Sequence, residues 1–249
     1  MDLLNELTPE SVHLVIADPP YNLGKDFGNG TDNWESIQDW LNWSRKWVQG
    51  CKRALRPTGS IFVYAIHRYA CYIQCGMYDL GLLYGRQIIW HYENGWSQYS
   101  KAPAATYETI LWFTKSKEHT YHTIREPYKS QDRLRYKVIK NGKVWRPNPL
   151  GKRGGDVWNI PTLAGSRFAT EKVDHPTQKP LALCDKIIRH FSNPGDLILV
   201  PFAGSGSECV SALANGRDFI GFEINPAYVK LADERIAAYK AKSELRMMT

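Results

Sequence analysis

The 249-residue chain has little of what would assign it to a specialised class of protein. Its five cysteines include no CxxC pair, which favours reduced thiols in a cytoplasm over a disulfide framework. No apolar run approaches the roughly 18 residues that span a bilayer. The opening residues, MDLLNELTPESV, carry acids in place of the basic region of a secretory signal. The sequence therefore predicts a cytoplasmic protein without membrane contact.

Metal-ligating residues are equally sparse. His67, Cys71 and Cys75 are spaced four residues apart and could share one helical face. No fourth ligand is evident, and a packed helix face explains the same spacing. Trp40, Trp43 and Trp47 likewise have the spacing of a core-facing helix. We therefore predict no metal site and expect the tryptophans to lie in the core.

Acidic residues are nearly absent from one part of the chain. Residues 125–153 hold ten Lys or Arg and two acids, a net charge of +8. The rest of the chain, with 22 basic and 23 acidic residues, has a net charge of −1. Tyr128, Tyr136 and Trp145 lie between the charges. A solvated basic face is the simpler interpretation, but a surplus this localised favours a surface that binds phosphates.

Predicted strands and helices alternate along the chain. Apolar runs predict strands at 12–17, 61–65, 87–90, 109–113, 196–200 and 218–223, and helical spacing predicts helices at 3–7, 36–55, 67–78, 181–191, 207–215 and 226–240. This alternation indicates an α/β fold with a Rossmann-like, mostly parallel sheet and helices on both faces. Core periodicity is lost in 116–165, which predicts an inserted region between two parts of one domain, 1–115 and 166–249.

A glycine turn follows the strand predicted at 196–200. In the sequence FAGSG, Gly204 and Gly206 allow a tight turn and close approach of a ligand. Glu223 ends the next strand, where its carboxylate can accept hydrogen bonds from ribose hydroxyls. Cys209 replaces the third glycine of the dinucleotide pattern, which disfavours a dehydrogenase. The unit predicts a site for an adenosine-bearing cofactor, with an ordinary strand-to-helix turn as the alternative.

The first predicted strand ends in the sequence DPPY. Ligands of open α/β sheets bind beyond the carboxyl ends of strands, so DPPY and FAGSG can face one crevice. Pro19 and Pro20 stiffen the loop and hold the Asp18 carboxylate beside the Pro19 carbonyl. Two adjacent acceptors match an exocyclic amino group, and Tyr21 offers a face to a flat heterocycle. The loop therefore suits the amino edge of a base.

Together, Asp18–Tyr21 (DPPY), His175–Pro180 (HPTQKP) and Phe202–Gly206 (FAGSG) resemble the β-class amino-group DNA methyltransferases, in which the catalytic motif precedes the cofactor motif. The resemblance extends from about residue 3 to residue 240 and is weakest in 116–165. It implies the methyltransferase fold in permuted motif order. It also implies methyl transfer from S-adenosylmethionine to adenine N6 of a base flipped out of double-stranded DNA, as in restriction-modification systems.

The resemblance implies roles for individual residues. Asp18 and the Pro19 carbonyl would accept hydrogen bonds from N6, on a loop stiffened by Pro20, and Tyr21 would stack on the base. The cofactor would be bound by Phe202, Ala203, Gly204, Ser205, Gly206, Glu223, Thr177 and Lys179. A solvent-exposed position is the alternative for Lys179. Residues 116–165 would be the target-recognition region, with DNA contacts from Arg133, Arg135, Lys137, Lys140, Lys143, Arg146, Lys152 and Arg153.

The chain departs from the family pattern at two points. Val200 stands where the family has an aspartate beside the cofactor. The chain also begins inside the first helix, so an edge of the adenine pocket would be missing or supplied by another segment. The open alternatives are methylation of cytosine N4 or of RNA, a catalytically impaired DNA-binding relative, and a dehydrogenase. The resemblance also admits a homodimer.

Overall fold

The computed structural model describes residues 2–25, 27, 32–96 and 101–247. Within these ranges, seven strands form the main sheet: β1 (Val12–Ala17), β2 (Leu55–Ala65), β3 (Leu83–Trp96), β4 (Ala105–Thr114), β9 (Val157–Asn159), β10 (Leu197–Val200) and β11 (Asp218–Gly221). Their order is β11-β10-β1-β2-β4-β3-β9. The four strands from β11 to β2 are parallel, whereas β4 runs antiparallel to both of its neighbours. The predicted mostly parallel α/β fold is confirmed.

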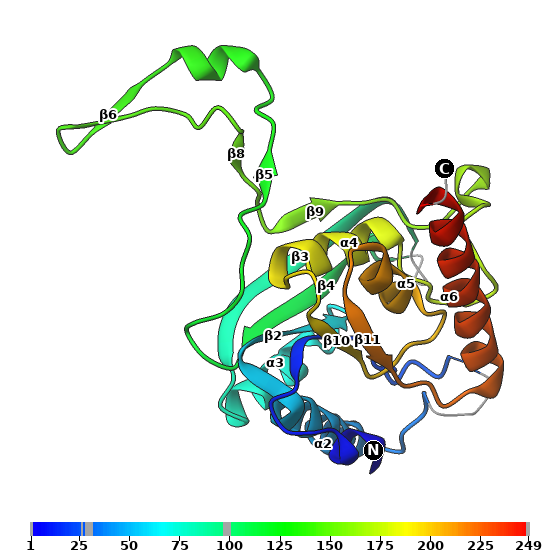
Figure 1. Cartoon of the computed structure of the whole chain (residues 1–249). Helices are drawn as coiled ribbons and strands as arrows, with labels where there is room; N and C mark the ends of the chain where they lie inside the picture. Colours follow the sequence, from blue (N-terminus) through cyan, green and yellow to red (C-terminus); the bar gives the residue numbers. More distant parts are fainter. Residues whose placement is uncertain (1, 26, 28–31, 97–100, 248–249) are drawn as a thin grey trace.

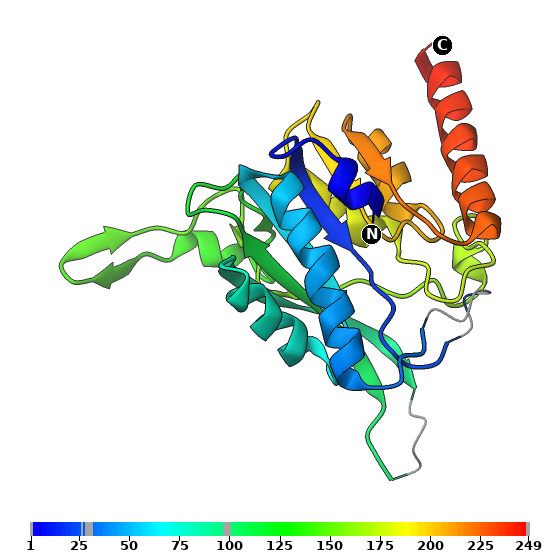
Figure 2. The same ribbon diagram turned by 90° about the horizontal axis from the view of Figure 1, so that it is seen from below.

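Helices cover both faces of this sheet (Figures 1 and 2). They are α1 (Asp2–Glu6), α2 (Ile37–Ala54), α3 (Ala70–Asp79), α4 (Leu181–Phe191), α5 (Ser207–Ala214) and α6 (Pro226–Met247). Because side chains alternate along a strand, β1 serves two cores. Leu14 and Ile16 pack in the core that includes α4 and α5, whereas Val15 and Ala17 pack in the core that includes α2 and α3.

The helix α2 shows how local sequence sets an element's limits. Ser36 caps its first turn, with the Ser36 hydroxyl accepting a hydrogen bond from the backbone N–H of Asp39 at 3.1 Å. Trp40, Trp47 and Cys51 then recur at helical spacing and are almost fully buried. The predicted helix at 36–55 therefore corresponds closely to the observed one.

Between β4 and β9 the chain leaves the body as a long arm, residues 125–153 (Figure 1). Its base is the pair β5 (Arg125–Glu126) and β8 (Lys152–Arg153), and its tip is the pair β6 (Val138–Lys140) and β7 (Lys143–Trp145). A short 3-10 helix, η1 (Gln131–Arg135), lies between them, and a second, η2 (Ser166–Phe168), follows β9. The sequence does not predict β9, which pairs with β3 inside the main sheet although it lies within 116–165.

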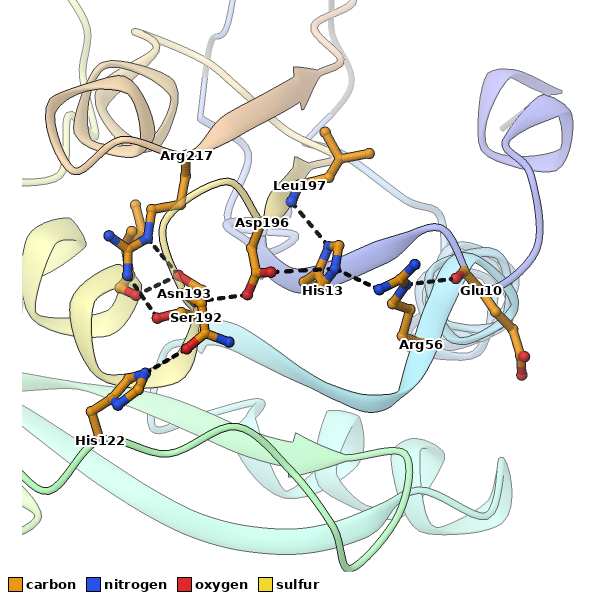
Figure 3. Close-up of polar contacts among 10 residues, drawn as sticks. Glu10, His13, Arg56, His122, Ser192, Asn193, Asp196, Leu197 and Arg217 are labelled. Atoms are coloured by element: carbon orange, nitrogen blue, oxygen red, sulfur yellow. Dashed lines mark hydrogen bonds and ion pairs between the residues drawn. The ribbon is translucent and has the colours of Figure 1, made fainter.

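A polar network joins the amino ends of the parallel strands (Figure 3). The backbone N–H of Leu197 donates to His13 Nδ1 at 3.0 Å and links β10 to β1. Arg217, which precedes β11, is 7% exposed. Its Nε donates to Ser192 Oγ at 3.0 Å and its Nη2 to the Ser192 carbonyl at 2.6 Å. Arg217 thus ties β11 to the end of α4, at the amino ends of the strands.

Replacing Arg217 with alanine should lower the free energy of unfolding by about 2–4 kcal/mol, because the buried acceptors of Ser192 lose their donors. Arg189→Ala is the matched control, since Arg189 is exposed on α4. It should change the free energy of unfolding by less than about 0.5 kcal/mol. Urea denaturation of both variants measures the difference, and equal effects would contradict the structural role of Arg217.

Candidate active site

A cavity of about 610 Å³ lies at the carboxyl ends of β1 and β10. These two strands are parallel neighbours, paired through Leu14 with Ile198, so the loops that follow them meet at one edge of the sheet. The cavity is lined by eleven of the twelve residues that the sequence assigns to catalysis and cofactor binding: Asp18, Pro19, Pro20, Tyr21, Thr177, Lys179, Phe202, Ala203, Gly204, Ser205 and Glu223. The structure therefore brings the three motifs together.

The DPPY loop is held in place by residues that the sequence did not indicate. The carboxylate of Asp32, which is 1% exposed, accepts backbone hydrogen bonds from Asn22 at 2.6 Å, Leu23 at 3.1 Å and Lys25 at 2.9 Å. The Trp40 indole donates to the Pro20 carbonyl at 2.9 Å. These contacts join residues that are 7 to 20 positions apart in the sequence, and no local sequence pattern indicates them.

The Asp18 carboxylate has a partner on each oxygen. The Tyr21 hydroxyl donates to Oδ1 at 2.5 Å, and the Lys179 ammonium donates to Oδ2 at 2.7 Å. Lys179 Nζ also lies 3.6 Å from Glu108 Oε2, on β4. The Asp18 side chain is 16% exposed and that of Lys179 only 4%. The exposed position considered for Lys179 is therefore wrong, and its ammonium is engaged by the DPPY carboxylate.

Burial and neighbouring charges set the protonation states around Asp18. Burial by itself lowers the pKa of Lys179, but the carboxylates of Asp18 and Glu108 outweigh it and raise the pKa above its ordinary value. Burial and then the Asp18 charge raise the pKa of Tyr21 well above its usual range. Lys179 therefore stays cationic, and Tyr21 keeps the proton that it donates to Asp18.

Glu208 is a second buried acid that the sequence reading missed. It lies in the first turn of α5, lines the cavity and is 5% exposed. Burial, followed by the Asp18 charge, raises the pKa of Glu208 to about 7. Its Oε1 has no hydrogen-bond partner among the described residues. The one signal in the sequence that could have indicated Glu208 is its place directly after FAGSGS.

The glycine turn packs tightly against two other segments. Gly204 has φ +48°, and its N–H donates to Glu223 Oε2 at 2.8 Å. A Cβ on Gly204 would lie 2.9 Å from His175 Nε2, so the absent side chain leaves room for the HPTQKP segment. Gly206, the predicted residue outside the lining, has φ +74°, and a Cβ there would lie 2.9 Å from Ala232 on α6. Both glycines are required by close approach of protein groups.

His175 itself is partly buried beside this turn. Its ring meets that of Tyr228 edge to face, with centroids 4.5 Å apart. Burial, more than any charge, lowers the pKa of His175 to about 4. The imidazole is therefore neutral at pH 7, and its Nδ1 accepts a hydrogen bond from the backbone N–H of Thr177 at 3.3 Å.

Aromatic side chains form one wall of the cavity. Trp43, Trp47 and Phe202 line it, with the Phe202 ring centroid 5.6 Å from that of Trp43 and 5.3 Å from that of Trp47. The prediction that the tryptophans of α2 pack in the core is confirmed, with Trp43 partly buried against that core. Trp43 and Trp47 also line the cavity. Val200, where the family has aspartate, is 1% exposed and packs in the core instead.

The predicted DNA-binding residues all lie on the arm, which projects from the body of the molecule (Figures 1 and 2). All eight are exposed: Arg133, Arg135, Lys137, Lys140, Lys143, Arg146, Lys152 and Arg153. Two have acidic partners, Lys152 with Glu126 at 3.0 Å and Arg135 with Asp132 at 3.2 Å. The remaining basic side chains leave the arm strongly positive.

Metal-ligating side chains are dispersed over the part of the chain that the structure describes. Over the described ranges, no three His, Cys, Asp or Glu side chains cluster closely enough to hold a metal ion. Cys71 and Cys75 are exposed thiols on α3. In that same part of the chain, no helix combines the length and apolar character needed to cross a membrane.

Comparison with known proteins agrees with this architecture. The profile of a family described as DNA methylase matches residues 12–234. The chain is similar to the type II methyltransferase M1.MboII of Moraxella bovis, with 34% identity over 241 residues, covering 93% of this chain and 92% of that protein. It is also 34% identical over 251 residues to the DNA adenine methyltransferase YhdJ of Escherichia coli (strain K12), covering 97% of this chain and 82% of that protein.

A solved structure shares the fold. The PvuII DNA methyltransferase, a cytosine-N4-specific enzyme, superposes with a TM-score of 0.70 at 20% identity, over 94% of this chain and 82% of that one. The family profile that matches residues 12–234 is that of a DNA methylase and not of a dehydrogenase. Because the family profile spans nearly the whole chain and two relatives exceed 30% identity over most of their length, the chain belongs to the DNA methylase family.

Proposed function

We propose that this chain transfers a methyl group from S-adenosylmethionine to the N6 amino group of an adenine flipped out of double-stranded DNA. The observation that carries the proposal is the shared cavity, which places the DPPY carboxylate and the glycine turn on one surface. The name of the relative YhdJ, a DNA adenine methyltransferase, favours adenine as the base. A base inside a duplex cannot reach such a cavity unless it is flipped out.

The size of the cavity and the chemistry of its lining residues suit the cofactor. A volume of about 610 Å³ falls within the range of cofactor pockets. Glu223 stands beside the glycine turn, where its carboxylate can bind ribose hydroxyls, and the aromatic wall offers a face for adenine. S-adenosylmethionine supplies a methyl group activated by a sulfonium charge. The Glu208 carboxylate gives the cavity an acidic group that attracts a cation, whereas the Asp18 charge is already paired with Lys179.

The chain's own residues then orient the amino group. Asp18 and the Pro19 carbonyl accept its two N–H hydrogen bonds, which draws the nitrogen lone pair out of conjugation with the ring. Lys179 and Tyr21 hold the Asp18 carboxylate in one orientation, so no reorganisation is needed when the base arrives. Catalysis therefore rests on positioning and electrostatics, without a covalent enzyme intermediate.

Cytosine N4 is the second candidate base, because the same two acceptors suit any exocyclic amino group and the structurally similar PvuII enzyme is cytosine-N4-specific. Incubation of plasmid DNA with labelled S-adenosylmethionine, followed by nucleoside analysis, separates the two. Label should appear in N6-methyladenine. Label in N4-methylcytosine would show that the substrate base is cytosine. DNA binding without any label would show that the chain binds DNA but does not methylate it.

Asp18→Ala should reduce the single-turnover rate of methyl transfer by at least about 100-fold, because the amino group loses a charged acceptor. Cofactor affinity, measured by calorimetry, should change by less than about threefold, since Asp18 is assigned to the base. Asp218→Ala, at an exposed position of β11, is the control and should keep the wild-type rate. Wild-type turnover by Asp18→Ala would remove Asp18 from the chemistry.

Cofactor binding should release protons from Glu208, because its pKa is raised to about 7 and an arriving cation favours the carboxylate. Calorimetry in buffers of different ionisation enthalpy counts these protons. The Glu208→Gln variant should not show the proton release that accompanies cofactor binding to the wild type near pH 6.5. S-adenosylhomocysteine, which lacks the sulfonium charge, is the control ligand and should release fewer protons from the wild type.

A stability measurement shows independently whether Glu208 titrates in this range. Its folded-state pKa lies above the unfolded value, so the native state binds the extra proton and wild-type stability falls as pH rises from about 4.5 to about 7. Glu208→Gln should lack this loss, which is on the order of 3 kcal/mol. Equal pH dependence of both proteins would show that Glu208 is already ionised.

A further inference from the structure

The tip of the arm is a β-ribbon that no other part of the described chain covers. β6 and β7 pair antiparallel, with Val138 opposite Trp145, Ile139 opposite Val144 and Lys140 opposite Lys143. Asn141 and Gly142 turn the chain between them with φ +52° and +71°, the left-handed values of a tight hairpin turn. Figures 1 and 2 both show this hairpin at the far end of the arm.

This ribbon exposes apolar side chains on both faces. Ile139 is 66% exposed, Val144 and Trp145 are each 56% exposed, and Val138 is 41% exposed. A two-stranded ribbon without a core is at best marginally stable alone in water. Exposed apolar side chains gathered on such an element mark a surface that binds a partner.

Strand periodicity decides which side chains act together. Val138 and Lys140 share one face of the ribbon with Lys143 and Trp145, and Ile139 and Val144 share the other. On the first face, Lys140 and Lys143 stand directly opposite each other. Two like charges in this position repel, and an electron-rich partner relieves the repulsion. The first face therefore combines apolar contact with paired cationic donors.

The charge of the arm identifies the partner. Residues 125–153 have a net charge of +8, so a second copy of the arm would be repelled, whereas a polyanion is attracted. The major groove of B-DNA is about 12 Å wide and admits a two-stranded β-ribbon. In that groove, lysine donates to guanine O6 and N7, and apolar side chains contact the thymine methyl group.

We propose that the β6–β7 ribbon enters the major groove of the substrate DNA and reads base edges with the face formed by Val138, Lys140, Lys143 and Trp145. This inference rests on DNA being the substrate, as proposed above. It separates two functions within the arm: the ribbon tip selects the sequence, and the remaining basic residues hold the phosphates. The opposite face, Ile139 and Val144, then points away from the bases.

The test compares the two faces of the ribbon. Methylated positions are mapped by sequencing on a plasmid treated with the wild type or with double variants. Lys140→Ala/Lys143→Ala and Val138→Ala/Trp145→Ala should each lower the rate ratio of preferred to non-preferred sites by about tenfold or more. Ile139→Ala/Val144→Ala, the matched control, should keep the wild-type ratio. Unchanged ratios in the first two variants would overturn the proposal.

Two further measurements complete the test. All variants should keep the wild-type melting temperature and cofactor affinity, because the substituted side chains are exposed and remote from the cavity. Bound wild-type protein should protect guanine N7, in the major groove, from dimethyl sulfate, and protection confined to adenine N3 in the minor groove would contradict the proposal. This footprint needs no methyl transfer, so it tests the ribbon even where the proposed catalytic function fails.

Self-association is the competing outcome. Sedimentation of the wild type and of Val138→Ala/Trp145→Ala, without DNA, should show the same oligomeric state. A wild-type dimer that dissociates in this variant would overturn the proposal and assign the ribbon to a contact between two copies of the chain.

Discussion

A buried ammonium group constrains the site more than any other single feature. Lys179 can remain charged at 4% exposure only beside carboxylates, because an unpaired buried cation costs several kcal/mol. Its partners are Asp18, 161 residues earlier in the chain, and Glu108 on the antiparallel strand β4. Lys179 thus joins the HPTQKP segment to the DPPY loop and to strand β4 of the main sheet. A shift of one segment would separate the buried ammonium group from its carboxylate partners.

Other non-covalent contacts fix the DPPY loop in the same way. Prolines limit the backbone of the loop, Trp40 fixes the Pro20 carbonyl, and Asp32 binds the three backbone N–H groups that follow. The Asp18 oxygens are then fixed by Tyr21 and Lys179. Orientation of the carboxylate is therefore established before any ligand arrives, which is the condition for electrostatic stabilisation without reorganisation.

The sequence predicts the local parts of this arrangement and misses the long-range ones. Helices α2 and α4 follow from apolar periodicity, and the meeting of the DPPY and FAGSG loops follows from parallel strand topology. The pairing of Lys179 with Asp18 and the burial of Glu208 depend on packing between distant segments. The three-residue strand β9 is too short for a periodic signal, and its partner β3 lies more than 60 residues earlier.

Packing also explains why the cavity has a buried acid at Glu208 and none at Val200. Val200 fills a core position with an apolar side chain, which is where a carboxylate would be costly without a partner. Glu208 instead carries its carboxylate in the first turn of α5, where backbone N–H groups favour negative charge, while burial and Asp18 oppose it. The balance leaves Glu208 near its titration point at neutral pH. An acid in this position responds to the charge of whatever enters the cavity, in a way that a fully ionised aspartate would not.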